Sequence, residues 1–129
     1  MAVSGGIVER YGADLDAVTC KVAAAVTEGR LVEGVAGGNR RVQHAGNNSL
    51  LVCGVALQTA SAAEDEIGVA TEGFVELTAS GAVANGNRLR AGANGVAVAV
   101  AADGDPRLIV AISYGTAADG EKFLAKLCL

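Results

Sequence analysis

Residues 83–104 read VANGNRLRAGANGVAVAVAADG, and this stretch decides the predicted fold. It contains Asn85-Gly86, Asn94-Gly95 and Asp103-Gly104, dipeptides that favour the positive φ angles of tight hairpin turns. Asp119-Gly120 repeats the signal further along the chain. Turn dipeptides spaced this closely leave room only for short strands between them, which predicts an antiparallel, all-β protein.

The segments between these turns carry β-forming residues, at 74–77, 88–90, 96–100 and 107–113. From Val96 to Ala101 valines alternate with alanines, so the predicted strand has one bulky face and one thin face. Pro106 is expected to open the last of these strands, where its missing N–H does least harm. The pattern predicts an all-β meander or a small antiparallel β-barrel, and the family resemblance described below implies a barrel or a β-clip/β-tulip-like domain.

The two ends of the chain are less clear. Residues 14–26 place Leu15, Val18, Val22 and Ala25 at helical spacing, but a strand centred on 18–22 fits equally well. The strand is favoured by the family resemblance described below. In residues 122–129, Phe123, Ala125, Leu127 and Leu129 occupy every second position, which suits a final strand. We predict an N-terminal arm over 1–16 and a single β-rich domain over 17–129.

An internal echo suggests two similar β-units. Val55-Ala56-Leu57 and Val110-Ala111-Ile112 are separated by 55 residues, and an acidic turn follows each of them. A looser echo relates Gly29 to Gly86, at a separation of 57. We interpret both as a duplication in which two β-units each leave an apolar face exposed and cover one another.

Composition points to a core of small side chains. The chain has 129 residues, of which 51% are hydrophobic and only 3% aromatic. Stabilisation by burial scales with apolar area, so a monomer of Val, Leu, Ile and Ala has a thin core. Added burial between subunits would therefore be favourable, which suggests a homo-oligomer.

Charge and hydropathy exclude several partners. The net charge is −4, and Arg40-Arg41 is the only adjacent pair of cations, so a basic face for nucleic acid is not expected. No apolar run approaches the roughly 20 residues of a membrane span, and no signal peptide is predicted. Cys20, Cys53 and Cys128 lie among apolar residues without a C-x-x-C pair, which predicts buried free thiols.

No catalytic, cofactor or metal site is predicted. His44 is the single histidine and is interpreted as a surface loop residue, without the partners of a nucleophile or a zinc ion. Glu64-Asp65-Glu66 lacks the ligand spacing of a calcium loop and is interpreted as a turn. The glycines of 34–39 match neither phosphate-binding fingerprint and are interpreted as a loop. We expect the protein not to be an enzyme.

The order of several weak motifs carries a resemblance. Val69-Ala70-Thr71-Glu72-Gly73 is followed by Val83-Ala84-Asn85-Gly86-Asn87, then by Gly92-Ala93-Asn94-Gly95 and Leu108-Ile109-Val110-Ala111. From about Val26 onward this order resembles the capsid cement, or head decoration, proteins of tailed bacteriophages. Residues 1–16 and 34–46 match poorly, and Glu64-Asp65 stands where a glycine turn is more usual.

The resemblance implies a protein made in the host bacterial cytoplasm that binds the outer capsid surface of the virion. Its partners would be the major capsid protein, whose subunits it bridges, and further copies of itself, a homotrimer being favoured over a homodimer. We expect Ile7, Val8 and Tyr11 of the arm to supply partner contacts, unless the arm is a disordered tail. The alternatives are a virion-surface carbohydrate- or host-binding module, which needs exposed aromatic rings, and a small β-clip enzyme, for which no polar cluster is found.

Overall fold

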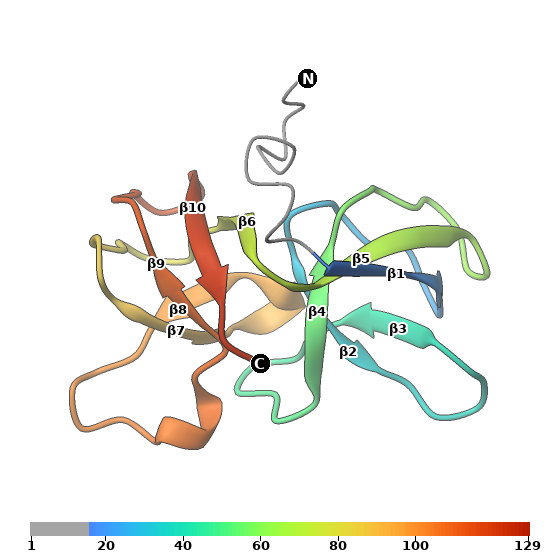
Figure 1. The fold of residues 1–129 in the computed structure, drawn as a ribbon, viewed down its shortest axis with the longest axis horizontal. Helices are drawn as coiled ribbons and strands as arrows, with labels where there is room; N and C mark the ends of the chain where they lie inside the picture. Colours follow the sequence, from blue (N-terminus) through green and yellow to red (C-terminus); the bar gives the residue numbers. More distant parts are fainter. Residues whose placement is uncertain (1–15) are drawn as a thin grey trace.

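A computed structural model of the protein describes residues 16–129, which form two β-units lying side by side (Figure 1). No α-helix occurs in this range, so the predicted all-β class is confirmed. The first unit contains β1 (Asp16–Val22), β2 (Leu31–Gly34), β3 (Arg41–His44), β4 (Val52–Ala56) and β5 (Glu66–Glu72). The second contains β6 (Phe74–Thr78), β7 (Arg88–Ala91), β8 (Ala97–Ala99), β9 (Ala111–Ser113) and β10 (Lys122–Leu127).

The first unit is a closed barrel with strand order β1-β3-β2-β4-β5, closed by pairing of β5 with β1. All of its pairs are antiparallel except β1 with β3, where Lys21 and Val22 face Arg41 and Val42 in parallel. The strand interpretation of residues 14–26 is therefore correct from Asp16 to Val22. The prediction of an antiparallel barrel needs one correction, because the parallel β1–β3 pair completes the ring.

The second unit repeats the topology of the first. Its order is β6-β10-β9-β7-β8. Read around the ring from β1 in the opposite direction, the first unit is β1-β5-β4-β2-β3, which is the same order with each strand five places earlier. An isolated parallel bridge between Ala79 and Ala97 stands where β1 pairs with β3. The second unit thus remains a sheet whose ends meet at one bridge.

Local contacts confirm the repeat. The antiparallel bridges Val26–Ala60 and Val83–Ala117 are related by a shift of 57 residues on both sides. In the acidic turns, the Ala62 N–H donates to the Asp65 carboxylate (3.2 Å). The Ala118 N–H donates to the Glu121 carboxylate (2.8 Å) in the same way. The predicted two-unit plan is therefore a structural repeat at the looser offset of 57. The 55-residue alignment is out of register, because strand pairing matches Gly54, and not Ala56, to Ala111.

The hydrophobic core consists of two clusters, and their boundary does not coincide with the boundary between the two units. One fills the barrel and is made of Cys20, Val22, Val26, Val32, Val42, Ala56, Ala60, Ile67 and Val69. The other fills the second unit and also includes Leu31, Val55 and Ala70, which project outward from the barrel strands. The core of the second unit is thus continuous with the junction between the units.

Polar contacts and one glycine fix this junction. The Gly95 N–H donates to the Ala45 carbonyl, and the Asn48 N–H to the Ala91 carbonyl, both at 2.9 Å. Arg30 donates from Nη1 to the Asn94 carbonyl (3.1 Å). Gly73, which lies between β5 and β6, has a φ of +103°, a conformation that favours glycine.

The turn predictions are mostly confirmed. Gly86, Gly95 and Gly120 have positive φ, whereas Gly104 is not among the positive-φ residues. Asn94-Gly95 joins paired strands β7 and β8, and Asp119-Gly120 joins paired strands β9 and β10. Asn85-Gly86 and Asp103-Gly104 instead connect strands that are not neighbours in the sheet.

One strand prediction is corrected. Residues 107–113 do not form one strand, because a 3-10 turn, η3 (Pro106–Leu108), precedes β9. The Asp105 side chain caps this turn by accepting from the Arg107 N–H (2.9 Å), and proline suits its first position. In β8 only Ala97 is fully buried, whereas Ala99 and the valines at 96, 98 and 100 are half-buried. The parallel bridge to Ala79 pairs Ala97 with the residue that follows β6.

Candidate interaction surface

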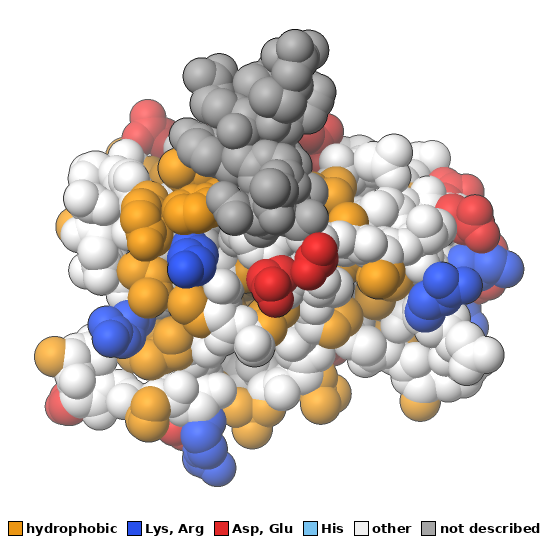
Figure 2. Space-filling view, in the orientation of Figure 1, with side chains coloured by type: hydrophobic (Ala, Val, Ile, Leu, Met, Phe, Trp, Pro, Cys, Tyr) orange, Lys and Arg blue, Asp and Glu red, His pale blue; other side chains and the backbone are white. Residues whose placement is uncertain are grey.

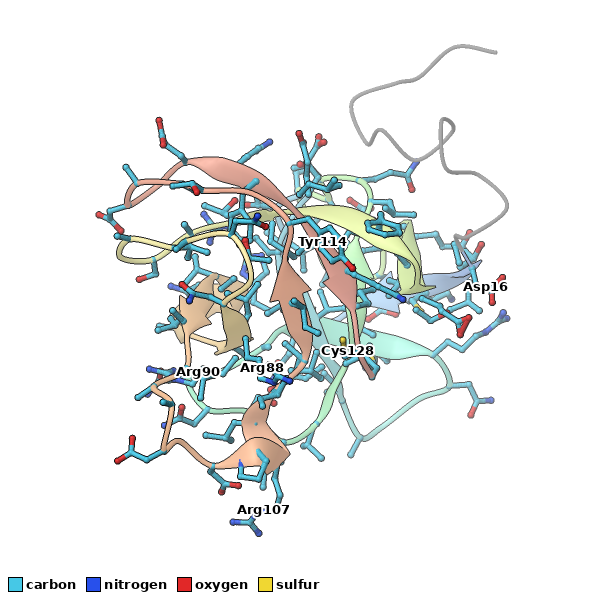
Figure 3. The ribbon with its side chains drawn as sticks, turned by 60° about the vertical axis from the view of Figure 1, so that its left-hand side comes forward. Asp16, Arg88, Arg90, Arg107, Tyr114 and Cys128 are labelled. Atoms are coloured by element: carbon cyan, nitrogen blue, oxygen red, sulfur yellow. The ribbon has the colours of Figure 1, made fainter. Side chains whose placement is uncertain are left out.

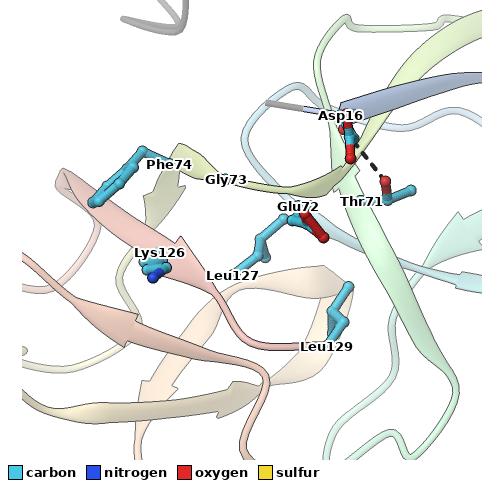
Figure 4. Close-up of a pocket in the computed structure, with 8 residues that line it drawn as sticks. All are labelled: Asp16, Thr71, Glu72, Gly73, Phe74, Lys126, Leu127 and Leu129. Atoms are coloured by element: carbon cyan, nitrogen blue, oxygen red, sulfur yellow. Dashed lines mark hydrogen bonds between the residues drawn. The ribbon is translucent and has the colours of Figure 1, made fainter. Parts of the chain in front are cut away.

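A groove follows the seam where the chain passes from the barrel to the second unit (Figure 4). It encloses about 590 Å³ and is lined by Asp16, Thr71, Glu72, Gly73, Phe74, Lys126, Leu127 and Leu129. The Thr71 hydroxyl donates to the Asp16 carbonyl (3.3 Å). The Leu127 N–H donates to the Gly73 carbonyl (2.9 Å). These bonds hold the two walls of the groove in place.

The groove carries both charge signs. Asp16 and Glu72 lie on the barrel side, and Lys126 lies on the β10 side. Asp16, Glu72 and Lys126 are exposed. Such a surface suits a polar partner surface better than a small apolar ligand.

An apolar patch adjoins the groove on the outer face of the second unit. Phe74 and Tyr114 pack edge to face, with ring centroids 5.1 Å apart and an interplanar angle of 79°. Tyr114 keeps 51% of its surface exposed, and Figure 3 shows it on the surface. Strand register places Lys126 beside both Phe74 and Ile112, and Ile112 beside Arg88. Hydrophobic side chains gather over β9 and β10 in Figure 2.

A second apolar patch lies on the loop between β3 and β4. Leu50 and Leu51 are 62% and 66% exposed, and Leu129 is 54% exposed. Leu50 and Leu129 line one shallow groove together with Ile109 and Cys128. Large exposed aliphatic side chains that gather in this way mark protein contact sites. The sequence offered one signal that was not used, since Leu50-Leu51 follows the turn at 46–49 outside any alternating pattern.

The three arginines of the second unit lie on one side of it (Figure 3), and of these only Arg107 forms a salt bridge with a described carboxylate. Arg107 pairs with Asp105 at 2.8 Å, which lowers the pKa of the Asp105 carboxyl. Arg90 donates to the Asn47 side chain at 3.0 Å. Figure 3 shows Arg88, Arg90 and Arg107 on one side of the unit. Two of the three are thus held by partners within the protein.

His44 requires a correction. It lies in β3 and is half-buried, because β3 pairs with β2 and places His44 opposite Val32. Its Nε2 accepts from the Thr27 N–H (2.9 Å). Burial, reinforced by nearby Arg30, lowers the pKa of His44. The residue is therefore a neutral hydrogen-bond acceptor in a strand, and not a loop residue.

The cysteine prediction is also only partly right. All three thiols are free, but only Cys20 is buried, while Cys53 and Cys128 are exposed. Cys53 lies at an open end of the barrel, and Cys128 lies just beyond the last strand. Apolar neighbours in the sequence do not ensure burial at the ends of strands.

The remaining predicted sites concern metal binding, membrane spans, the acidic residues and the N-terminal arm. Within residues 16–129, no group of three or more His, Cys, Asp or Glu side chains could hold a metal ion. In the same range no helix is long and apolar enough to cross a membrane. Glu33 accepts hydrogen bonds from Ser49, Gln43 and Gly46, which lower the pKa of its carboxyl and tie the β3–β4 loop to the barrel. The predicted contact residues Ile7, Val8 and Tyr11 lie outside the described residues.

The fold has a counterpart among solved structures. The chain is similar to the crystal structure of the head fiber gp8.5 N base in bacteriophage phi29. The TM-score is 0.74 at 18% sequence identity, over 88% of this chain and 94% of that chain. At this identity the similarity establishes the shared fold. No protein-family model matches the sequence, and no curated protein matches it.

Proposed function

We propose that this protein is a structural component of a tailed-phage head that binds the outer surface of the shell. The observation that carries the proposal is the similarity of fold to a phage head fiber base, which extends over nearly the whole of both chains. The capsid-protein resemblance of the sequence supports the same role independently. The exposed apolar side chains Leu50, Leu51 and Tyr114 supply surface for protein contacts.

In the finer form of the proposal, the protein is a cement protein that bridges neighbouring subunits of the major capsid protein. It acts as a homo-oligomer, a trimer being favoured. Several copies of one weak contact, held together in an oligomer, give high avidity on a shell that repeats the same site. The two leucine side chains of the β3–β4 loop and the Phe74–Tyr114 patch are separate surfaces, so one can serve the shell and the other a neighbouring copy.

The test mixes the purified protein with expanded heads that lack it, taken from the phage whose genome encodes the chain. Binding is measured by sedimentation with the heads, and shell stability by thermal release of DNA. We expect saturable binding and a higher release temperature. Binding without added stability would leave a head protein that is not a cement, and no binding would reject the head role.

The oligomer is tested separately by sedimentation equilibrium of the free protein. We expect a trimer, and we expect the double variant Leu50→Ser, Leu51→Ser to lose either self-association or head binding. The matched control is Thr59→Ser, an exposed position away from both patches. A wild-type protein that stays monomeric at high concentration would contradict the homo-oligomer.

A carbohydrate- or host-binding module is the second candidate, favoured by the exposed ring of Tyr114. Sugar rings stack on such aromatic faces. Phe123 is buried, with 5% of its surface exposed, and therefore adds nothing to a stacking surface. Binding to a glycan array that is lost in Tyr114→Ala would favour this role over the cement role.

A further inference from the structure

The structural repeat identifies one surface that is buried in the second unit and open in the barrel. Strand register matches Val18 and Val69 of the barrel to Val75 and Ala125 of the second unit. The same registers match Cys20 to Leu77. Gly54 in β4 corresponds to Ala111 in β9 by strand register. The residues that precede them, Cys53 and Val110, therefore correspond as well. These residues surround one end of each unit.

In the second unit this end is covered by the barrel. Val75 and Val110 are only 1% and 5% exposed, and they share a core cluster with Leu31, Ala45 and Val55 of the barrel. Branched aliphatic side chains therefore fill the end of the second unit from outside.

In the barrel the matching end is open. Val18 is 44% exposed, and Cys53 is also exposed. The end forms a concave surface of about 400 Å³, lined by Val18, Cys20, Gly34, Val35, Gly38, Arg40, Arg41, Val42, Cys53, Val69 and Thr71. We call this surface the barrel socket. Apart from two arginines its lining is uncharged.

We propose that the barrel socket binds an extended segment of a partner protein, in which a branched apolar side chain lies next to a carboxylate. The apolar side chain would take the place that barrel residues such as Val55 occupy at the end of the second unit. This inference goes beyond the proposed function, because it does not depend on a phage shell as the source of the segment.

The charges at the rim argue for the carboxylate. Arg40 and Arg41 are the charged residues of the lining. Arg41 contacts Glu64 through Nη2 at 2.7 Å, while its buried Nε has no hydrogen-bond partner among the described residues. Arg40 is exposed at the rim, where its guanidinium can pair with a carboxylate of the partner.

The same charges argue against a second copy of this chain as the occupant. Leu31 and Ala70 of the barrel lie at the junction. By strand register, Leu31 corresponds to Arg88 and Ala70 corresponds to Lys126, both on the outer face of the second unit. Leu31 lies against Gly95 at the junction. Gly95 lies two residues before Ala97, which forms the parallel bridge, and Arg40 lies two residues before Val42, which forms the matching parallel pair. Gly95 of the second unit therefore corresponds to Arg40 of the barrel. A second copy stacked in the same way would bring Arg88 against Arg40, which is repulsive.

The experiment uses the full chain and two synthetic peptides as probes. Both have a central leucine in a glycine-serine background, flanked by aspartate and glutamate in one peptide and by two lysines in the other. Alkylation of Cys53 by iodoacetamide is followed by mass spectrometry, with exposed Cys128 as the internal control. The reaction is run at mildly alkaline pH because partial desolvation by the surrounding protein raises the pKa of the Cys53 thiol, although the residue keeps exposed surface.

We expect several millimolar acidic peptide to slow Cys53 alkylation at least about threefold, since access controls thiol reactivity, and to leave Cys128 unchanged. In Arg40→Glu the preference should reverse, so that the lysine peptide protects. Val18→Asp should abolish protection by the acidic peptide while the circular dichroism spectrum stays that of the wild type.

Three results would overturn the proposal. They are absence of protection by the acidic peptide, equal protection by the two peptides, and a preference unchanged by Arg40→Glu. None of these depends on whether the protein binds phage heads, so failure here is distinguishable from failure of the proposed function.

Discussion

The two β-units have the same topology but different closure. In the barrel, β1 spans 7 residues and reaches both β5 and β3, so the ring closes. In the second unit, β6 spans 5 residues and β8 only 3, and a single bridge joins the ends of the sheet. Strand length therefore decides whether the same arrangement becomes a barrel or a sheet.

The difference also sets how each unit is stabilised. The barrel is filled by its own residues, with Cys20 where the second unit has Leu77. The second unit has a larger side chain at some matched positions, such as Phe123 for Ile67, and an alanine at others, such as Ala79 for Val22. It shares its core with the outer face of the barrel. We infer that the second unit depends on the barrel for its stability more than the barrel depends on it. Four predictions test this comparison.

The largest effect is expected at the junction. Gly95 has a φ of +75°, and a Cβ there would collide with the backbone of Leu31. Gly95→Ala should lower the free energy of unfolding by about 3 kcal/mol, the sum of left-handed strain and overpacking. Chemical denaturation measures the change.

The matched control is Gly86→Ala, where φ is +89° but no atom lies within 4 Å of the added Cβ. Strain alone should cost about 1 kcal/mol there. Equal losses in the two variants would show that the junction is not tightly packed at Gly95.

The next effect compares two matched positions. Val75 is 1% exposed and Val18 is 44% exposed. Val75→Ala should cost about 2 kcal/mol by loss of burial and creation of a cavity, whereas Val18→Ala should change stability by less than about 0.5 kcal/mol. Urea titrations of both variants measure the free energies of unfolding. A similar loss of stability in the two variants would contradict the predicted difference between the covered and the open end.

A smaller effect concerns the acidic turns. Glu64 has a φ of +72° at the position where the second unit has Gly120, with a φ of +83°. Glu64→Gly should raise the free energy of unfolding by about 0.5 to 1 kcal/mol, because relief of left-handed strain exceeds the loss of an exposed ion pair with Arg41. Thermal unfolding measures it. Gly120→Ala should act in the opposite direction, and a destabilised Glu64→Gly would mean that the ion pair dominates.

The smallest effect is a pH dependence confined to the barrel. The pKa of His44 is lowered by burial and by Arg30, so the unfolded chain binds the proton more readily than the folded one. Stability should therefore fall as pH decreases through the ordinary histidine pKa of about 6.5, and level off below the lowered folded value. Protonation also removes the acceptor for the Thr27 N–H.

Hydrogen exchange at Thr27 between neutral and mildly acidic pH measures this effect, and His44→Gln should flatten it. The matching position of the second unit is Ala99, two residues beyond the bridged Ala97, so β8 should show no such change. Glu33, whose pKa is lowered by three hydrogen bonds, contributes stability that is lost at more acidic pH. Equal acid sensitivity of the two units would contradict the assignment to His44.

Much of the fold was predictable because local signals agreed. The positive-φ glycines at 86, 95 and 120 were readable from Asn-Gly and Asp-Gly pairs, and the acidic turns revealed the repeat. The candidate surface was much less predictable. Leu50 and Leu51 look like core residues in the sequence, and the seam groove joins residues 16, 71–74 and 126–129, which no local pattern connects.

The sequence by itself determined the β class, the turns and the two-unit plan, because alternation and turn chemistry act over a few residues. Only the tertiary structure decided which faces are buried. It buried Ala97 of β8 and left Val98 and Ala99 half-buried, and it left Cys53 exposed. The barrel covers one end of the second unit, while the barrel socket stays open. Burial depends on which surfaces contact each other across the junction. Those contacts join residues that are far apart in the sequence, so a local sequence pattern does not determine them.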